Sequence, residues 1–173
     1  MSRYIRSRQS GGTFFFTVVA FNRMPFFTND DFRQALRESI TETRQYHPFI
    51  IDAWVLLPDH LHCIWTLPDD DNNFSIRWGK IKAGVSRRLD SGIRPQSSKH
   101  ESAVWQRRFW EHQIRDQDDY IRHMDYLLYN PVKHGLVKCV SDWPYSSFHR
   151  LVQKGVYPVD WAASQDIDGD FGE

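Results

Sequence analysis

Two histidines separated by one residue, His60 and His62, form the most distinctive chemical pattern in this sequence of 173 residues. They follow a Pro-Asp turn and begin a run rich in apolar residues, which predicts a strand from His60 to Leu67. Side chains alternate between the two faces of a strand, so both imidazoles point the same way and can chelate one divalent ion. The competing interpretation is a pair of surface histidines that bind no metal.

A second set of polar side chains recurs every four residues on a helix predicted from about Gln117 to Asn130, where Pro131 follows. Arg122, Tyr126 and Asn130 are neighbours at this spacing, and a helical wheel places them on an exposed flank, away from the apolar stripe. The phenol of Tyr126 is a possible nucleophile, and the amide oxygen of Asn130 could complete a His-His-Asn metal site. The competing interpretation is an ordinary amphipathic helix with a surface tyrosine.

Other residues near this helix leave alternatives open. Tyr129 is the main rival nucleophile, because it also lies off the apolar stripe. His123 lies one turn before Tyr126, and we expect it to face solvent. The pattern assigns no role to His112 or His134.

The net charge of zero conceals an asymmetry along the chain. Four arginines precede the first acidic residue, Asp30, and nine basic residues between positions 74 and 108 are opposed by two acidic ones. Clustered basic charge suits a polyanionic partner, although a solvated surface is the simpler interpretation. If the partner is DNA, we expect contacts from Arg3, Arg6, Arg8, Arg77, Lys80, Lys82, Arg87, Arg88, Arg107, Arg108 and Arg122.

The elements that position these groups follow the order β-α-β-β-α-β-α. Strands are predicted over 13–20, 49–57, 60–67 and 104–114. Helices are predicted from the capping run 28–31 to Pro48, over 74–89 and over 117–130, with a polar loop at 90–103. The first six elements fit an α+β, ferredoxin-like split βαβ fold: a four-stranded antiparallel sheet with helices on one face. The last helix is an addition at the C-terminal end, and would carry Tyr126.

Length and composition predict one domain, 1–157, followed by a flexible acidic tail, 158–173, with five acidic residues and no Lys or Arg. Apolar residues make up 40% of the chain, which excludes wholesale disorder. No apolar run could span a bilayer, and the N-terminus lacks the apolar core of a secretion signal, so we expect no membrane association. Two cysteines make no disulfide framework and favour a reducing cytoplasm.

Four sequence blocks together resemble the REP-associated tyrosine transposases, a branch of the single-tyrosine transposases. The blocks occur in the family's order within 11–160. They are Pro58–His62 with the HUH motif (His, bulky apolar, His), Trp105–His112, Tyr126–Gly135 with the pattern Tyr-x3-Asn-Pro-Val-x-His-Gly, and Ser141–Phe148.

The resemblance implies a bacterial, cytoplasmic and nucleoid-associated enzyme that cuts and rejoins single-stranded DNA beside palindromic REP hairpins. It implies Tyr126 as the nucleophile, His60, His62 and Asn130 as metal ligands, and Mg²⁺ or Mn²⁺ as the metal. Attack would leave a 5′-phosphotyrosine and release a 3′-hydroxyl, so rejoining needs no ATP. We expect a monomer or homodimer. Two alternatives remain: a hairpin-binding module of the same fold that does not cut, and a metal phosphodiesterase that activates water.

Overall fold

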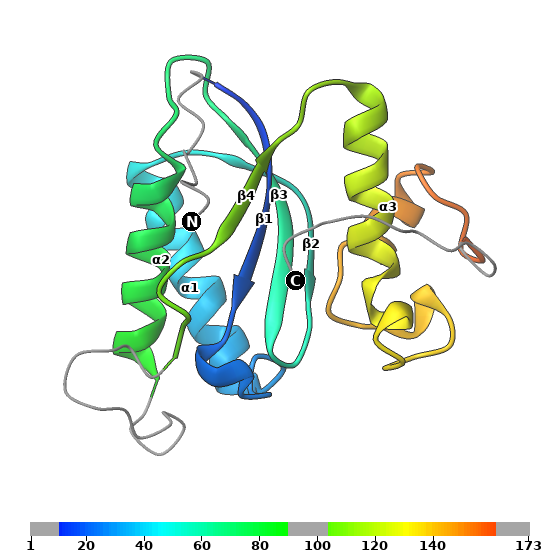
Figure 1. The fold of residues 1–173 in the computed structure, drawn as a ribbon, viewed down its shortest axis with the longest axis horizontal. Helices are drawn as coiled ribbons and strands as arrows, with labels where there is room; N and C mark the ends of the chain where they lie inside the picture. The colour runs from blue at the N-terminus through cyan, green and yellow to red at the C-terminus, as the bar shows by residue number, and fades with distance from the viewer. Residues whose placement is uncertain (1–10, 90–103, 162–173) are drawn as a thin grey trace, which may run out of the picture.

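A computed structural model describes residues 11–89 and 104–161 of the chain. One antiparallel sheet has the strand order β2-β3-β1-β4. Its strands are β1 (Gly12–Val19), β2 (Ile50–Leu56), β3 (His60–Leu67) and β4 (Trp110–Gln113). Helices α1 (Asp30–Tyr46) and α2 (Phe74–Arg88) cover one face, and α3 (Gln117–Lys133) covers the other (Figure 1). The predicted α+β, ferredoxin-like fold is confirmed.

Some predictions lie outside the described residues: the arginines at positions 3, 6 and 8, the loop at 90–103, and the tail from 162. Within the described ranges, no helix has both the length and the hydropathy needed to cross a bilayer.

Strand β1 divides its phenylalanines between two cores because its side chains alternate between the faces of the sheet. Phe14 and Phe16 pack beneath α1 and α2, where the rings of Trp65 and Trp78 stack with centroids 4.3 Å apart. Phe15 points to the opposite face and packs beneath α3. Both faces of the sheet are therefore buried, and the side chains of β3 also alternate between the two cores.

Helices α1 and α2 approach closely at Gly84. A Cβ atom at this position would lie 2.7 Å from Oγ of Ser39 on α1, so a side chain there would force the helices apart. Glycine inside a helix costs about 1 kcal/mol relative to alanine. Here that cost permits the close packing of the two helices.

The fourth strand is shorter than predicted. Trp105 forms an isolated bridge with Ala20, whereas Trp110 pairs with Thr17. Three steps along β1 thus face five steps along the partner segment, so the ladder is interrupted between Trp105 and Trp110. The single strand predicted over 104–114 is wrong for this reason.

Helix α3 continues through Pro131 to Lys133, so the predicted end at Asn130 is wrong. A proline in a helix removes one backbone donor, and the turn after it can still close. The N–H of His134 donates to the carbonyl of Asn130 at 3.0 Å, and that of Leu136 donates to Pro131 at 2.9 Å. These bonds carry the helix through Lys133, three residues beyond its predicted end at Asn130.

The segment after α3 encloses this helix from its other side. Ser146 bridges Val55 on the outer edge of β2, and α4 (Phe148–Gln153) contributes Phe148 and Leu151 to the core beneath α3. Trp161 packs against the rings of Phe148 and Tyr157, so the chain still contacts the rest of the domain at Trp161. Helix α3 is therefore covered by the sheet on one side and by the C-terminal segment on another.

Candidate active site

The two histidines of β3 lie side by side on the face of the sheet that α3 covers. His60 is 2% exposed and His62 is fully buried, with ring centroids 5.0 Å apart. Their placement on one face follows from the alternation predicted from the sequence. These exposures do not fit the surface position of the competing interpretation.

Each imidazole is oriented by a hydrogen bond to its Nδ1 atom. Nδ1 of His60 lies 2.7 Å from a carboxylate oxygen of Asp59, and Nδ1 of His62 lies 2.8 Å from Oγ1 of Thr17 on β1. The hydrogen bond from His60 lowers the pKa of Asp59 to about 2, so Asp59 is ionised at neutral pH. The carboxylate therefore accepts a hydrogen bond from a protonated Nδ1 of His60. This tautomer gives His60 an Nε2 lone pair, the arrangement that carboxylate partners impose on metal-binding histidines.

Tyr126 lies against this pair instead of on an exposed flank. Its ring is 2% exposed, with its centroid 5.3 Å from His62 and 6.2 Å from Phe15. The wheel-based expectation is wrong because it assumed one buried face, whereas α3 is covered by both the sheet and the C-terminal segment. This burial places the ring of Tyr126 against the imidazole of His62, one of the candidate metal ligands.

Asn130 is brought to the same place by helical spacing. Tyr126, Asn130 and His134 follow one another at intervals of four, so they share one helix face. Tyr126 contacts His62, and the ring of His134 lies 5.1 Å from that of His60. Asn130, fully buried between them, therefore lies on the face directed at the histidine pair.

Arg122 does not join this group. It is exposed on α3, with one guanidinium nitrogen 3.4 Å from Asp119. The rival nucleophile Tyr129 is half-buried and packs in the core beneath α3, and no ring contact with His60 or His62 is found among the described residues.

Sequence analysis predicted no role for Lys133. The Lys133 ammonium donates a hydrogen bond to the Tyr126 hydroxyl at 3.2 Å and lies 4.7 Å from the centre of its ring. The two residues are seven apart, which is two helical turns. That spacing, extended past Pro131, was the signal that could have found Lys133.

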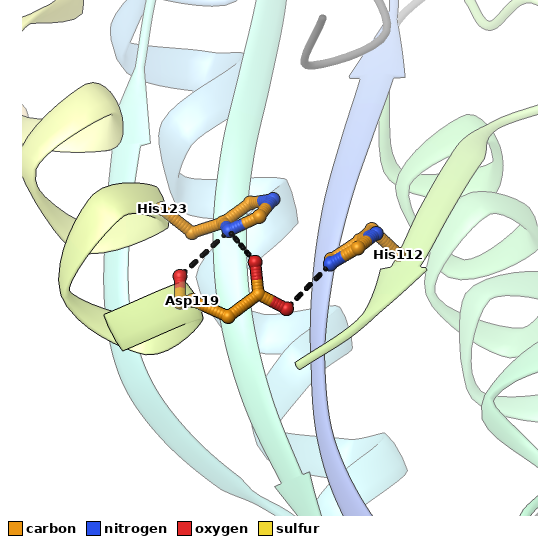
Figure 2. Close-up of side chains that lie close together, drawn as sticks. All are labelled: His112, Asp119 and His123. Carbon is orange, nitrogen blue, oxygen red and sulfur yellow. Dashed lines mark hydrogen bonds and ion pairs between the residues drawn. The ribbon is translucent and has the colours of Figure 1, made fainter. Parts of the chain in front are cut away.

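A second polar cluster lies beside this site, where β4 meets the start of α3 (Figure 2). His112 Nε2 lies 2.8 Å from Asp119 Oδ2, and the rings of His112 and His123 stack with centroids 4.4 Å apart. His123 is 6% exposed and packs against Phe15, so the expectation that it faces solvent is wrong. The polar atoms of these three residues lie within 4.8 Å of one another, a spacing that could hold a metal ion.

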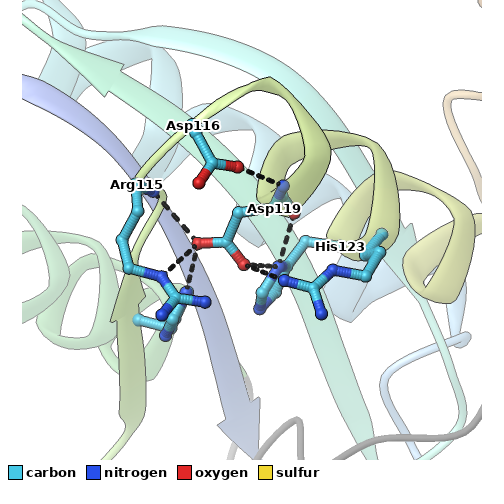
Figure 3. A network of polar contacts seen from close by, with 6 residues as sticks. Arg115, Asp116, Asp119 and His123 are labelled. Carbon is cyan, nitrogen blue, oxygen red and sulfur yellow. Dashed lines mark hydrogen bonds and ion pairs between the residues drawn. The ribbon is translucent and has the colours of Figure 1, made fainter.

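Hydrogen bonds account for this cluster without a metal. Figure 3 shows Asp119 within a ring of donors: its Oδ2 accepts from the backbone N–H and Nε of Arg115, and its Oδ1 faces Arg122 and His123. Burial raises the pKa of Asp119, but the hydrogen bonds from Arg115 and His112 outweigh it and hold the pKa well below the usual value. A cation would have to compete with two guanidinium groups. We therefore assign the cluster to fixing α3 against β4.

Two of the predicted DNA contacts have structural roles. Arg77 is fully buried, donates to the backbone carbonyls of residues 47, 48 and 73, and pairs with Asp71 at 2.7 Å. Arg88 joins α2 to α1 through ion pairs with Glu38 and Glu42. The sequence could not separate these residues from solvated cations, since their partners come from other elements.

The remaining predicted contacts differ in exposure. Lys82 is half-buried and donates to the carbonyl of Gln106 at 2.9 Å. The exposed ones are Lys80, Arg87, Arg107, Arg108 and Arg122. Helix α2, which carries two of them, lies on the opposite face of the sheet from the histidine pair (Figure 1).

Comparison with known proteins identifies the family of this chain. The profile of the family described as "Transposase IS200 like" matches residues 10–127. The REP-associated tyrosine transposase of Escherichia coli K12 is 49% identical over 162 residues, which cover 94% of this chain and 92% of that protein. A Haemophilus influenzae protein is 43% identical over 171 residues, which cover 96% of this chain and 97% of its own length.

A solved structure extends the agreement to three dimensions. The structure of a REP-associated tyrosine transposase bound to a REP hairpin matches with a TM-score of 0.85 and 46% identity, and covers 99% of this chain and 96% of that one. The chain belongs to the IS200-like transposases, and within them it is a REP-associated tyrosine transposase.

Proposed function

We propose that this enzyme recognises palindromic hairpins and cuts single-stranded DNA beside them, with Tyr126 as the nucleophile. The observation that carries the proposal is the contact between Tyr126 and His62, which places a phenol against a buried histidine pair. The 49% identity to the E. coli enzyme and the hairpin in the related structure support DNA hairpins as the substrate.

The residues at the site fit a divalent ion. His60 and His62 offer two imidazoles from one strand face, and Asn130 offers an amide oxygen from the facing helix. Mixed nitrogen and oxygen ligands suit Mn²⁺, and Mg²⁺ accepts the oxygen with water completing its shell. When bound, such an ion would neutralise charge on the scissile phosphate as a Lewis acid.

The reaction itself exchanges one phosphate ester for another. The phenol oxygen of Tyr126 forms a bond to phosphorus, and the bond from phosphorus to the 3′ oxygen breaks. The phenol proton leaves to solvent or a base, and the 3′ oxygen takes up a proton to become a hydroxyl. The ester energy is kept in the 5′-phosphotyrosine, so a 3′-hydroxyl can later reverse the step without a nucleotide cofactor.

Two local features support this role for Tyr126. The positive charge of Lys133 at the phenol oxygen favours loss of the phenol proton, and so favours the ionised oxygen that attacks phosphorus. Packing against His62 and Phe15 holds the ring in one orientation. Because the ring is 2% exposed, DNA has to displace the groups that cover it before a phosphate reaches the oxygen.

Formation of a covalent adduct tests the proposal. The protein would be incubated with Mn²⁺ and a hairpin oligonucleotide labelled at its 3′ end, because the 5′-phosphotyrosine retains the fragment on the 3′ side of the cut. The mixture would be denatured in detergent and separated by electrophoresis. A labelled band at the mass of protein plus cut strand is expected. Cleavage without that band would favour water activation, and binding without cleavage would favour a hairpin-binding module.

A further inference from the structure

Arg23 is one of the four arginines that precede the first acidic residue, and it has no role in the reaction proposed above. It ends a short 3₁₀ turn, Phe21–Arg23, that follows β1 almost directly. Strand β1 pairs with β3 so that Val19 lies opposite His60, and the turn therefore begins beside the first of the two histidines. Arg23 thus reaches the site from a segment of the chain other than β3 and α3.

The guanidinium of Arg23 contacts the carboxylate that orients His60. One guanidinium nitrogen donates to Oδ2 of Asp59 at 3.1 Å, while Oδ1 of Asp59 lies 2.7 Å from Nδ1 of His60. Each carboxylate oxygen thus has its own partner. A carboxylate held at both oxygens rotates less than one held at a single oxygen, so His60 has an acceptor in a fixed position.

Backbone hydrogen bonds attach the same segment to the residues just before His60. The N–H of Ala20 donates to the carbonyl of Asp59, and the N–H of Phe27 donates to the carbonyl of Pro58, both at 2.8 Å. One of these bonds lies before Arg23 in the chain and the other lies after it. The backbone on both sides of the arginine is therefore fixed relative to Asp59.

The backbone of the turn is strained at two successive residues. Asn22 has a φ of 50° and Arg23 has a φ of 51°, in the left-handed region that favours glycine. Asparagine adopts this region more readily than most residues, but arginine has no short polar side chain to compensate for it. Strain of this kind costs free energy, and it is concentrated at functional sites. The strained turn is a second, independent observation that points to a functional role for Arg23.

We infer that Arg23 is a positioning residue for the metal site, which rests on the proposed function. Arg23 fixes Asp59, and Asp59 in turn fixes the imidazole of His60 with Nε2 available as a ligand. In this role Arg23 is not itself a ligand, and it acts before any DNA is bound. The alternative role for an arginine beside the site is direct contact with a DNA phosphate.

The sign of the effect on metal affinity separates position from charge. Arg23 and a divalent ion are both positive, so loss of the Arg23 charge alone would strengthen metal binding. That effect is small, because the Arg23 side chain is 46% exposed and its charge is paired with Asp59. Loss of the groups that orient metal-binding histidines weakens metal affinity by about 10- to 100-fold. Weaker metal binding in the absence of Arg23 therefore reports the loss of its positioning role.

The test measures the Mn²⁺ affinity of the DNA-free protein by electron paramagnetic resonance, which detects the unbound ion. Arg23→Met should bind Mn²⁺ about threefold to tenfold more weakly, a smaller loss than for Asp59→Ala because Arg23 acts through Asp59. Arg23→Lys should recover most of the affinity, since its ammonium can still hold the carboxylate. Both substitutions place an unbranched side chain at the strained position, so backbone strain stays the same. Arg37→Met is the matched control, since Arg37 is exposed on α1.

A double-mutant cycle tests whether Arg23 acts through Asp59. In the Asp59→Ala protein, Arg23→Met should cause no further loss of Mn²⁺ affinity, because the group that Arg23 positions is absent. The melting temperature of Arg23→Met should change little, since exposed ion pairs contribute little to stability. A purely structural role would instead lower the melting temperature and leave the two losses additive.

Mn²⁺ binding by Arg23→Met that equals or exceeds wild type would overturn the inference, and so would additive losses in the cycle. Wild-type Mn²⁺ affinity together with weaker hairpin binding would assign Arg23 to a DNA phosphate instead. His62→Ala separates the two proposals. If it binds Mn²⁺ as tightly as wild type, the proposed metal site fails, and the positioning role fails with it. If His62→Ala loses affinity and Arg23→Met does not, the positioning role fails alone.

Discussion

The ammonium nitrogen of Lys133 lies 3.2 Å from the phenol oxygen of Tyr126, two turns along the same helix. This contact depends on α3 continuing through Pro131, because Lys133 is the last residue of the helix. A phenol ordinarily ionises near pH 10, so a cation at its oxygen favours the charge that attack on phosphorus requires.

Removing the Lys133 charge should slow attack. Lys133→Met is expected to reduce the single-turnover rate of adduct formation by about tenfold. This loss is smaller than the loss expected for a fully buried donor, because solvent screens the exposed Lys133. Lys133→Arg should recover part of the rate, since it keeps the charge. Lys138→Met is the control. A wild-type rate in Lys133→Met, with unchanged hairpin affinity, would show that the contact only packs the ring.

Loss of a metal ligand should separate cutting from binding. His60→Ala and His62→Ala are expected to abolish cleavage while hairpin affinity changes little, because affinity depends mainly on contacts to phosphates. Asn130→Ala should also slow cleavage. Chelation of divalent ions should abolish cleavage by the wild-type protein. Thermal melting must accompany these assays, since all three side chains are buried. Cleavage at the wild-type rate by both histidine variants would refute the metal site.

Asp119→Asn tests the network at the start of α3. The folded-state pKa of Asp119 is depressed below its unfolded value of about 4, so its stabilisation is present above that pH and is lost as pH falls. The variant should lose roughly 2 kcal/mol of stability at neutral pH. The difference in melting temperature from wild type should narrow progressively below about pH 4.

The control for this experiment is Asp118→Asn, an exposed acidic residue in the same helical turn. It should melt close to wild type across the pH range. A difference for Asp119→Asn that does not change with pH would mean that the carboxylate charge is not what the network uses.

Arg77 and Lys80, both predicted to bind DNA, should now behave differently. Arg77→Ala leaves buried carbonyls and Asp71 without their donor, and should cost about 3 kcal/mol or more in stability. Lys80→Ala should leave melting unchanged, because its side chain is exposed. Weaker DNA binding by a normally stable Arg77→Ala protein would restore the original prediction.

The histidine pair was predictable because it depends only on local periodicity. Alternation along a strand places His60 and His62 on one face whatever the rest of the chain does. The tight Pro-Asp turn likewise fixed the antiparallel pairing of β2 and β3. These features need no knowledge of tertiary contacts.

The environment of Tyr126 was not predictable from the same reasoning. A helical wheel finds one buried face, but α3 is covered by the sheet on one side and by Val140, Phe148 and Leu151 on another. Arg77 was misassigned for a similar reason, since its acceptors at residues 47 and 48 are far away in sequence. In both cases a distant segment decided which side chains are buried.

The most direct test of the central claim is to locate the residue that becomes linked to DNA. Adduct formed with Mn²⁺ and a hairpin oligonucleotide would be digested and the nucleotide-bearing peptide identified by mass spectrometry, alongside Tyr126→Phe and Tyr129→Phe proteins. We expect the phosphate on Tyr126, no adduct in Tyr126→Phe, and an undiminished adduct in Tyr129→Phe. Adduct in Tyr126→Phe, or phosphate on Tyr129, would contradict the account.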